Sequence, residues 1–184
     1  TLTPKPGFSE QRPEGWWAAL VGSLHEIWRA GVDPARVVAV SVTAGAHTHV
    51  LEDADGQILR PAIMWNDQRS GAQVEQQRAA HGPQILQQSG NRISATWTLP
   101  QLIWLRENEP EIHARIRRIL PAKDWLRSRL DGSYATDVTD AWGLMLADAR
   151  QGGWSADLAA MAGLAKDVLP EIVGSTSQTG VLTE

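Results

Sequence analysis

The chain has 184 residues, of which 42% are apolar and 21% charged, so it can form one substantial core and disorder is not expected. Its net charge of −4, without a long basic run, argues against binding of nucleic acid or of an anionic membrane surface. The absence of cysteine excludes disulfides, thiolate catalysis and cysteine-based zinc sites, and no apolar stretch approaches the roughly 18 residues that a membrane-spanning helix needs.

The first predicted helix follows a proline-rich extended segment. Residues Thr1 to Pro13 are polar and contain Pro4 and Pro6, which excludes a regular helix and a signal-peptide pattern. From Glu14 onward, apolar residues recur at helical spacing until Gly31. This apolar stripe consists of Trp17, Leu20, Val21, Leu24, Ile27 and Trp28. We therefore expect Trp17 and Trp28 to lie in the core.

Two strand-like stretches come next. Residues Val37 to Val42 form a continuous apolar run with β-branched side chains, which is typical of a strand buried on both faces of an α/β sheet. Residues 44–69 then predict a strand, a tight turn over Asp53–Gly56, and a second strand that leads into a helix. The second strand ends in a polar and aromatic group made of Trp65, Asn66, Asp67 and Arg69.

The rest of the chain predicts mainly helices. Residues 68–89 favour a helix that is broken at 81–83 by His-Gly-Pro. Thr98 is expected to cap the next helix, with Gln101 at the reciprocal capping-box position. The later elements are a short helix over 110–116, a strand at 119–120, a helix from Lys123 to the stop at Asp131-Gly132, a helix capped by Ser155, and a strand at 181–183. The chain is therefore predicted to be one α/β unit with helices added late.

His47 and His49 are two residues apart, which places both on one face of the predicted strand. Two imidazoles on one face can begin a zinc site, but no third ligand with supporting spacing is visible. The alternative is that both are ordinary strand histidines, buried or partly exposed. We therefore predict no metal site in the chain.

The strand end at Trp65 carries chemistry that suits a polyhydroxylated ligand. An aromatic ring covers the apolar C–H face of a sugar, while amide, carboxylate and guanidinium groups match its hydroxyls in both directions. Trp65 taken alone is better explained by packing, because large rings are usually buried. Asp67 is either a ligand or the cap of the following helix, and Arg69 would lock it through a charge-assisted bond.

Three segments carry a family resemblance. Leu-Arg-Pro-Ala-Ile-Met-Trp-Asn-Asp-Gln-Arg occupies 59–69, Lys-Asp-Trp occupies 123–125, and Ala-Thr-Asp-Val-Thr-Asp-Ala occupies 135–141. Together they resemble the N-terminal domain of the FGGY family of carbohydrate kinases, and within that family they are most similar to the xylulokinases. The latter two segments are expected to serve as helix caps and hydrogen-bonded scaffold.

The resemblance implies which residues meet the sugar. Aligned without gaps from the Trp-Asn-Asp run, His47 falls on the family histidine that contacts the ketose, and Trp65 falls on the tryptophan that walls the sugar site. The loop before the helix at Thr98 is placed over the substrate, although packing on its own helix is an alternative for Trp97. The implied substrate-binding set is Ala46, His47, Trp65, Asn66, Asp67, Thr96 and Trp97.

The chain departs from the family pattern beside His47. Ala46 replaces the methionine that usually precedes this histidine, and Gly45 stands where glutamine is usual. One apolar side chain that would line the pocket is therefore lost, which puts the identity of the sugar in question.

The fold implied by the resemblance is an α/β domain of the ribonuclease-H-like, actin-like ATPase class, with added helices and without its N-terminal hairpin. We expect residues 1–184 to be part of the N-terminal, sugar-binding domain, with the C-terminal nucleotide-binding domain absent. The family's Asp-x-Gly-Thr phosphate loop would precede Thr1, and its catalytic aspartate would follow Glu184. No catalytic residue is therefore expected in the chain, which alone should be inactive.

The implied reaction is ATP-dependent, Mg²⁺-assisted phosphorylation of D-xylulose to D-xylulose 5-phosphate, with ATP and Mg²⁺ bound mainly outside this chain. Three alternatives stay open: a kinase for another ketose, polyol or aldonate, a non-catalytic carbohydrate-binding module, and a regulatory homologue without activity. The expected partners are the sugar and ATP, without nucleic acid or membrane, in the cytoplasm. A homodimer also stays open.

Overall fold

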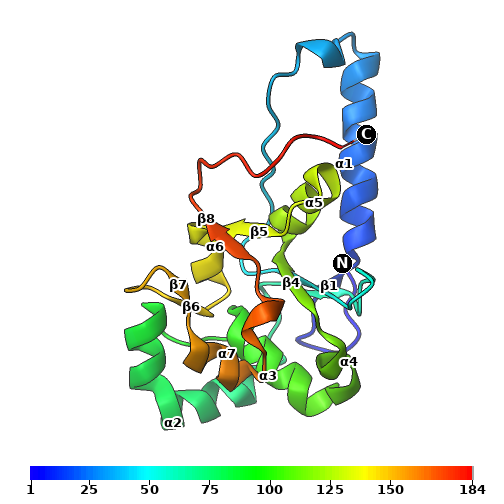
Figure 1. Ribbon diagram of the computed structural model, residues 1–184. Coiled ribbons are helices and arrows are strands. Elements are labelled where there is room, and N and C mark those ends of the chain that lie inside the picture. The colour runs from blue at the N-terminus through cyan, green and yellow to red at the C-terminus, as the bar shows by residue number, and fades with distance from the viewer. Residues whose placement is uncertain (184) are drawn as a thin grey trace.

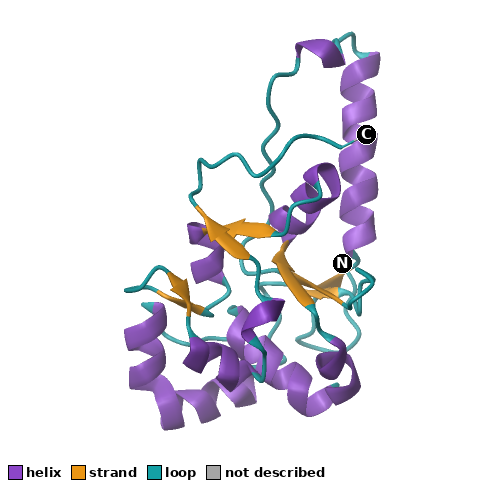
Figure 2. Cartoon of the chain, in the orientation of Figure 1, coloured by secondary structure: helices purple, strands orange, loops and turns teal. Residues whose placement is uncertain are grey.

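Short strands lie in the middle of the computed structural model, which describes residues 1–183, and helices pack around them (Figures 1 and 2). The strands are β1 (Glu10–Gln11), β2 (His49–Glu52), β3 (Ala62–Ile63), β4 (Arg118–Pro121), β5 (Ala135–Asp137), β6 (Ala147–Asp148), β7 (Gly153–Trp154) and β8 (Glu171–Val173). The helices are α1 (Pro13–Arg29), α2 (Gly71–Ser89), α3 (Thr98–Asn108), α4 (Pro110–Arg115), α5 (Ala122–Asp131), α6 (Val138–Gly143) and α7 (Ala156–Ala162). Two 3₁₀ turns, η1 (Pro34–Arg36) and η2 (Lys166–Val168), complete the described elements.

The strands pair two by two. β1 pairs with β3, β2 with β4, and β6 with β7, all antiparallel, whereas β5 and β8 are parallel. The β1–β3 pair sets Glu10 opposite Ile63, and the β2–β4 pair sets His49 opposite Pro121. These long-range pairs place the chain before α1 beside the strand end that carries Trp65.

Two apolar clusters form the core, one on each side of the β2–β4 pair. The larger cluster joins α2, α3 and α7 to Leu51 and Ile119, and the smaller joins Val50 and Leu120 to α5 and the first half of α1. Neighbouring residues of β2 therefore face opposite clusters, as the alternation of side chains along a strand requires.

Most predicted elements are confirmed. The helix after the proline-rich segment, the turn at Gly56, the helix stop at Gly132 and the cap at Ser155 all lie where local chemistry puts them. Gly56 and Gly132 have φ of 73° and 72°, a left-handed conformation that glycine adopts without steric cost. In the hairpin, β2 forms as expected, but β3 pairs with β1, and only Glu52 and Ile58 bridge across the turn.

The strand predicted at Val37 to Val42 is wrong. This segment is extended coil, and Val38 is 99% exposed. Among the described residues, no strand lies beside it to pair with its backbone. A β-branched sequence favours extended backbone, but a strand forms only where a partner supplies ladder hydrogen bonds.

The core prediction is wrong for Trp28, which is half-buried and belongs to neither apolar cluster, and it holds in part for Trp17. Helix α1 stands out from the rest of the molecule, with its far half beside the coil that follows it (Figure 1). Trp17 packs against the smaller core cluster, but Ile27 in the last turns is exposed. The apolar stripe predicted the helix correctly, but it did not predict how much of the apolar face is covered by other elements.

Three smaller predictions also differ. Helix α2 runs through Pro83 without a break. Proline removes only one hydrogen-bonding N–H from the helix, and the burial of Ile85 in the larger cluster stabilises the turn beyond it. Thr98 is the first residue of α3 and makes no cap hydrogen bond. Residues 181–183 are coil, although the Thr183 N–H still donates to the carbonyl of Leu130 at 2.8 Å.

Within residues 1–183, no helix has the length and apolar character to cross a bilayer.

Candidate functional site

The Asp67 side chain anchors the turn that contains Trp65 and Asn66. One carboxylate oxygen of Asp67 accepts from the backbone N–H of Ser9 at 2.6 Å and from the Arg69 guanidinium at 2.8 Å. The other accepts from the Arg69 backbone N–H and side-chain Nε, at 2.8 and 2.9 Å. Asp67 is 1% exposed, and both oxygens are occupied by partners within the protein. The predicted bond from Arg69 is therefore present, but Asp67 does not cap α2, whose N-cap residue is Ser70. Contact between Asp67 and a sugar stays a prediction.

Arg69 is fixed on every side. Its guanidinium lies 4.0 Å from the centroid of the Phe8 ring and 4.9 Å from that of Trp104, and the two rings meet edge to face. A second carboxylate, Glu10, lies 2.8 Å from the same guanidinium. Charge and ring contacts together immobilise the side chain on which the Asp67 turn rests.

His47 lies outside the strand that was predicted to hold it. Its φ of 58° is left-handed, which is uncommon for a residue other than glycine. Its Nδ1 lies 3.0 Å from the carbonyl oxygen of Gly143 and therefore donates to it, and its ring meets the Trp97 ring at 4.3 Å between centroids. In the neutral imidazole, Nε2 is then the acceptor for a hydroxyl donor.

His49 has a different environment, so the two histidines do not share a face. Its side chain is buried in β2, and its Nδ1 has no hydrogen-bond partner. Burial, assisted by the positive charge of Arg60, lowers the pKa of His49 to about 3. His49 is therefore a neutral core residue, and among residues 1–183 no group of three or more histidine or carboxylate side chains is placed to hold a metal ion.

Gln101 brings the Trp65 turn and the loop before α3 together. Its side-chain amide donates to the carbonyl of Ala95 at 3.2 Å and lies 3.5 Å from the carbonyl of Met64. The residues that follow these two carbonyls are Thr96 and Trp65, so both lie at the same edge of the molecule. Gln101 was predicted as a capping-box residue, but it acts instead as a bridge between two loops.

Helix α6 presents the Gly143 carbonyl to His47 and is anchored at its start. Asp137 caps it by accepting from the N–H groups of Thr139 and Asp140, which confirms the scaffold role predicted for this segment. Lys123 lies within 3.3 Å of Asp137 and Asp140 and also pairs with Asp124. Although burial opposes its charge, these carboxylates raise the pKa of Lys123.

The predicted site residues differ in how far they reach solvent. Ala46, Trp65 and Asn66 are exposed, with Trp65 at 52%, whereas His47, Thr96 and Trp97 are half-buried. Asp67 is the one member of the set that is buried. The solvent-reaching members of the set thus offer aromatic rings, an amide and an imidazole, the groups that bind hydroxyls and the apolar face of a sugar.

Sequence reasoning missed the contribution of α6. The Gly143 carbonyl sets the orientation of His47 from 96 positions away, and a backbone atom leaves no signal in the sequence. Trp142, beside Gly143, is 44% exposed despite its position on an anchored helix. An aromatic residue directly after the 135–141 scaffold segment was the available signal for an exposed ring next to Gly143 in the chain.

Comparisons with known proteins agree with one another. The model of the FGGY family of carbohydrate kinases, N-terminal domain, matches residues 1–184. A xylulose kinase from Lactococcus lactis is 35% identical over 97% of this chain, and one from Bacillus subtilis is 34% identical over 98%; the chain spans 36% of the length of each. The crystal structure of a xylulose kinase from Rhodospirillum rubrum superposes with a TM-score of 0.94 at 28% identity, covering 99% of this chain and 38% of that one. These matches confirm the predicted α/β fold class.

Proposed function

Because the chain belongs to the FGGY family of carbohydrate kinases, we propose that it is the sugar-binding N-terminal part of a kinase that transfers a phosphoryl group from ATP to D-xylulose. The observation that supports this proposal is a pair of contacts: Gln101 joins the Trp65 turn to the loop that carries Thr96 and Trp97, and the Trp97 ring meets the His47 ring. A kinase of this kind would act in the cytoplasm on a sugar and ATP.

Each residue of the proposed sugar site has a distinct proposed role. Trp65 covers the apolar side of the sugar chain, and the Asn66 amide both donates to and accepts from hydroxyls. His47, oriented by the Gly143 carbonyl, accepts a hydroxyl proton at Nε2. Thr96 and Trp97 close the adjacent side. These groups bind and orient the sugar, and orientation is a large part of what a kinase contributes to phosphoryl transfer.

ATP and Mg²⁺ are the proposed cofactors, and the described part of this chain does not fit the metal ion. Magnesium prefers carboxylate oxygens, and residues 1–183 contain no cluster of at least three such side chains that could hold it. The carboxylates of Asp124, Asp137 and Asp140 are engaged by Lys123. We therefore assign no step through Mg²⁺ to these residues, and the isolated chain should not catalyse.

A kinase for another ketose, polyol or aldonate is the second candidate, and the space beside His47 favours it. A side chain at Gly45 would meet nothing within 4 Å, and Ala46 is exposed. A glutamine and a methionine, usual in this family, would narrow that space. A larger or differently substituted sugar therefore fits here as well.

The test is ADP release by the full-length protein that contains this chain, with ATP, Mg²⁺ and a panel of ketoses, polyols and aldonates. We expect turnover of D-xylulose, a large rise in KM for Trp65→Ala, and little change for Trp28→Ala, a half-buried tryptophan of α1 away from the site. Turnover of another sugar alone would support the second candidate. Sugar binding without turnover on the whole panel would favour the carbohydrate-binding or regulatory alternative.

A further inference from the structure

The N-terminal strap, residues Gly7–Gln11, lies along the site segment 60–69. Its backbone exchanges hydrogen bonds with that segment at several points: the Met64 N–H donates to the Ser9 carbonyl at 3.0 Å, and the Gln68 N–H donates to the Gly7 carbonyl at 2.8 Å. Strand β1 in the strap pairs with β3 in the segment. The strap therefore follows the Trp65 turn from one end to the other.

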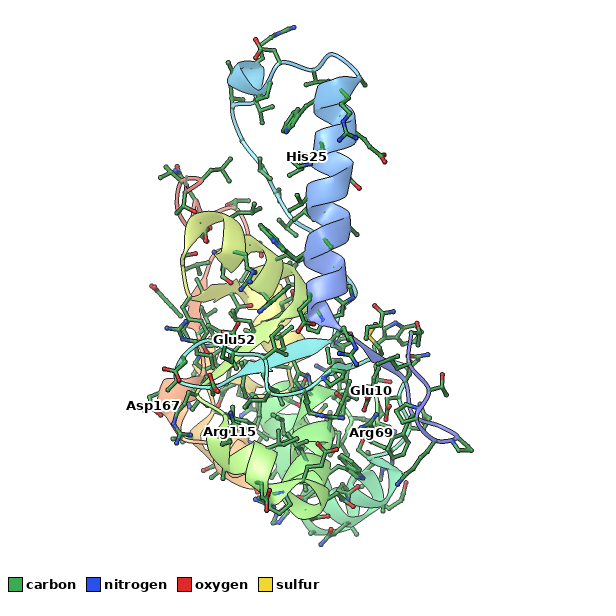
Figure 3. The ribbon with its side chains drawn as sticks, turned by 90° about the vertical axis from the view of Figure 1, so that its right-hand side faces the viewer. Glu10, His25, Glu52, Arg69, Arg115 and Asp167 are labelled. Atoms are coloured by element: carbon green, nitrogen blue, oxygen red, sulfur yellow. The ribbon has the colours of Figure 1, made fainter. Side chains whose placement is uncertain are left out.

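Glu10 joins both ends of this segment at one oxygen atom. Its Oε1 pairs with the guanidinium of Arg60, two residues before β3, and with that of Arg69, two residues after Asp67. Glu10 is buried, and the side chains of Arg60 and Arg69 are 8% and 1% exposed. Figure 3 shows Glu10 close to Arg69 on the same side of the molecule.

A buried carboxylate between two guanidinium groups cannot be removed without consequence. The two arginines would then face each other with less opposing charge, since Asp67 neutralises one and Glu109, 3.2 Å from Arg60, is more exposed. Arg69 donates hydrogen bonds to the Asp67 carboxylate, and Asp67 lies in the turn that contains Trp65 and Asn66. A displacement at Glu10 is thus transmitted through two hydrogen-bonded side chains to Trp65 and Asn66.

We propose that Glu10 is a positioning residue of the sugar site: it fixes the turn that presents Trp65 and Asn66, without touching the sugar itself. This inference rests on the proposed function and extends the site to a residue more than 50 positions away in the sequence. Ser9 takes part in the same positioning, because its backbone N–H donates to the Asp67 oxygen that also accepts from the Arg69 guanidinium.

The test uses Glu10→Gln in the full-length protein, because glutamine keeps the shape and an acceptor oxygen but removes the charge. We expect the KM for D-xylulose to rise about 10-fold, as misplacement of binding groups costs affinity, while kcat changes less than two-fold. Glu75→Gln is the matched control, since it removes the same charge from an exposed pair with Arg78 on α2 and should leave KM unchanged. If Glu10→Gln fails to fold, Glu10→Asp, which keeps the charge on a shorter side chain, replaces it.

A double-mutant cycle with Trp65→Ala separates positioning from general destabilisation. If Glu10 acts through the turn, Glu10→Gln raises KM by a clearly smaller factor once Trp65 is gone, because only Asn66 is then left to be misplaced. An unchanged KM for Glu10→Gln alone, or the same fold-change with and without Trp65, would overturn the inference while the proposed function stands. If wild type turns over no sugar, the inference falls together with the proposed function.

Discussion

At the scale of single residues, burial separates two histidines that the sequence presents as a pair. His47 donates to a backbone carbonyl at the site, whereas His49 is neutral inside the core. The same residue type two positions apart thus has a proposed binding role in one case and a packing role in the other, and the surroundings alone make the difference.

His49 predicts how stability depends on pH. Its pKa is about 3 in the folded protein and 6.5 when unperturbed, so between these values the unfolded chain binds the extra proton. Stability from this group is therefore present above pH 6.5 and falls as the pH drops toward 3, by about 2 kcal/mol at pH 5. Urea unfolding of His49→Gln at pH 8 and pH 5 should show a smaller difference than wild type. The exposed His25→Gln control should keep the wild-type difference; equal pH dependence in all three proteins would contradict the prediction.

Trp142 gives a second prediction at this scale. Because its ring is 44% exposed beside the carbonyl that orients His47, Trp142→Ala should raise the KM for the sugar about five-fold, or about 1 kcal/mol. Thermal unfolding measures the packing contribution of the buried part of the ring separately from the effect on KM. A large loss of stability with an unchanged KM would show that the ring serves the core instead.

At the scale of elements, the local sequence predicts where a helix ends better than it predicts which residues pack around that end. Glycine at a helix end is readable because it adopts left-handed backbone freely, as Gly132 and Gly163 do after α5 and α7. How much room surrounds such a glycine depends on other elements. Arg106 of α3 donates to the carbonyl of Met161 and lies against the end of α7.

These two glycines form a matched pair for a stability test. Their φ values, 72° and 74°, are alike, so alanine should cost about 1 kcal/mol at either position for the backbone alone. At Gly132 a Cβ meets nothing within 4 Å, but at Gly163 it would lie 2.9 Å from the Arg106 side chain. Gly163→Ala should therefore lower the free energy of unfolding by about 1–2 kcal/mol more than Gly132→Ala. Equal losses in urea unfolding would show that Arg106 moves aside freely.

At the scale of the whole molecule, one region stays apolar and open to solvent. Val38 and Val40 from the coil after α1, with Val181 and Leu182 near the chain end, are exposed. Extended segments with free backbone groups and apolar side chains favour association between chains.

We therefore expect this 184-residue chain to self-associate as its concentration rises. Val38→Lys, at the most exposed of these positions, should reduce the association without lowering the melting temperature, because the wild-type side chain packs on almost nothing. Sedimentation velocity over a concentration series would measure the effect. Leu86→Lys, an exposed apolar position on α2, is the control; an equal effect from both variants would mean that the coil has no special role.

The sequence by itself determined the α/β class and most helix bounds, and it supplied the proposed site residues around Trp65. These depend on periodicity, turn chemistry and a motif, all of which act over a few neighbouring residues. It failed at Val37 to Val42 and at Trp28, where the outcome depends on whether another element covers an apolar face. Only the tertiary structure showed that Gly143 orients His47, that Asp67 faces inward, and that Glu10 ties together Arg60 and Arg69. Contacts between residues 50 to 96 positions apart arise when the whole chain packs, and no local pattern encodes them.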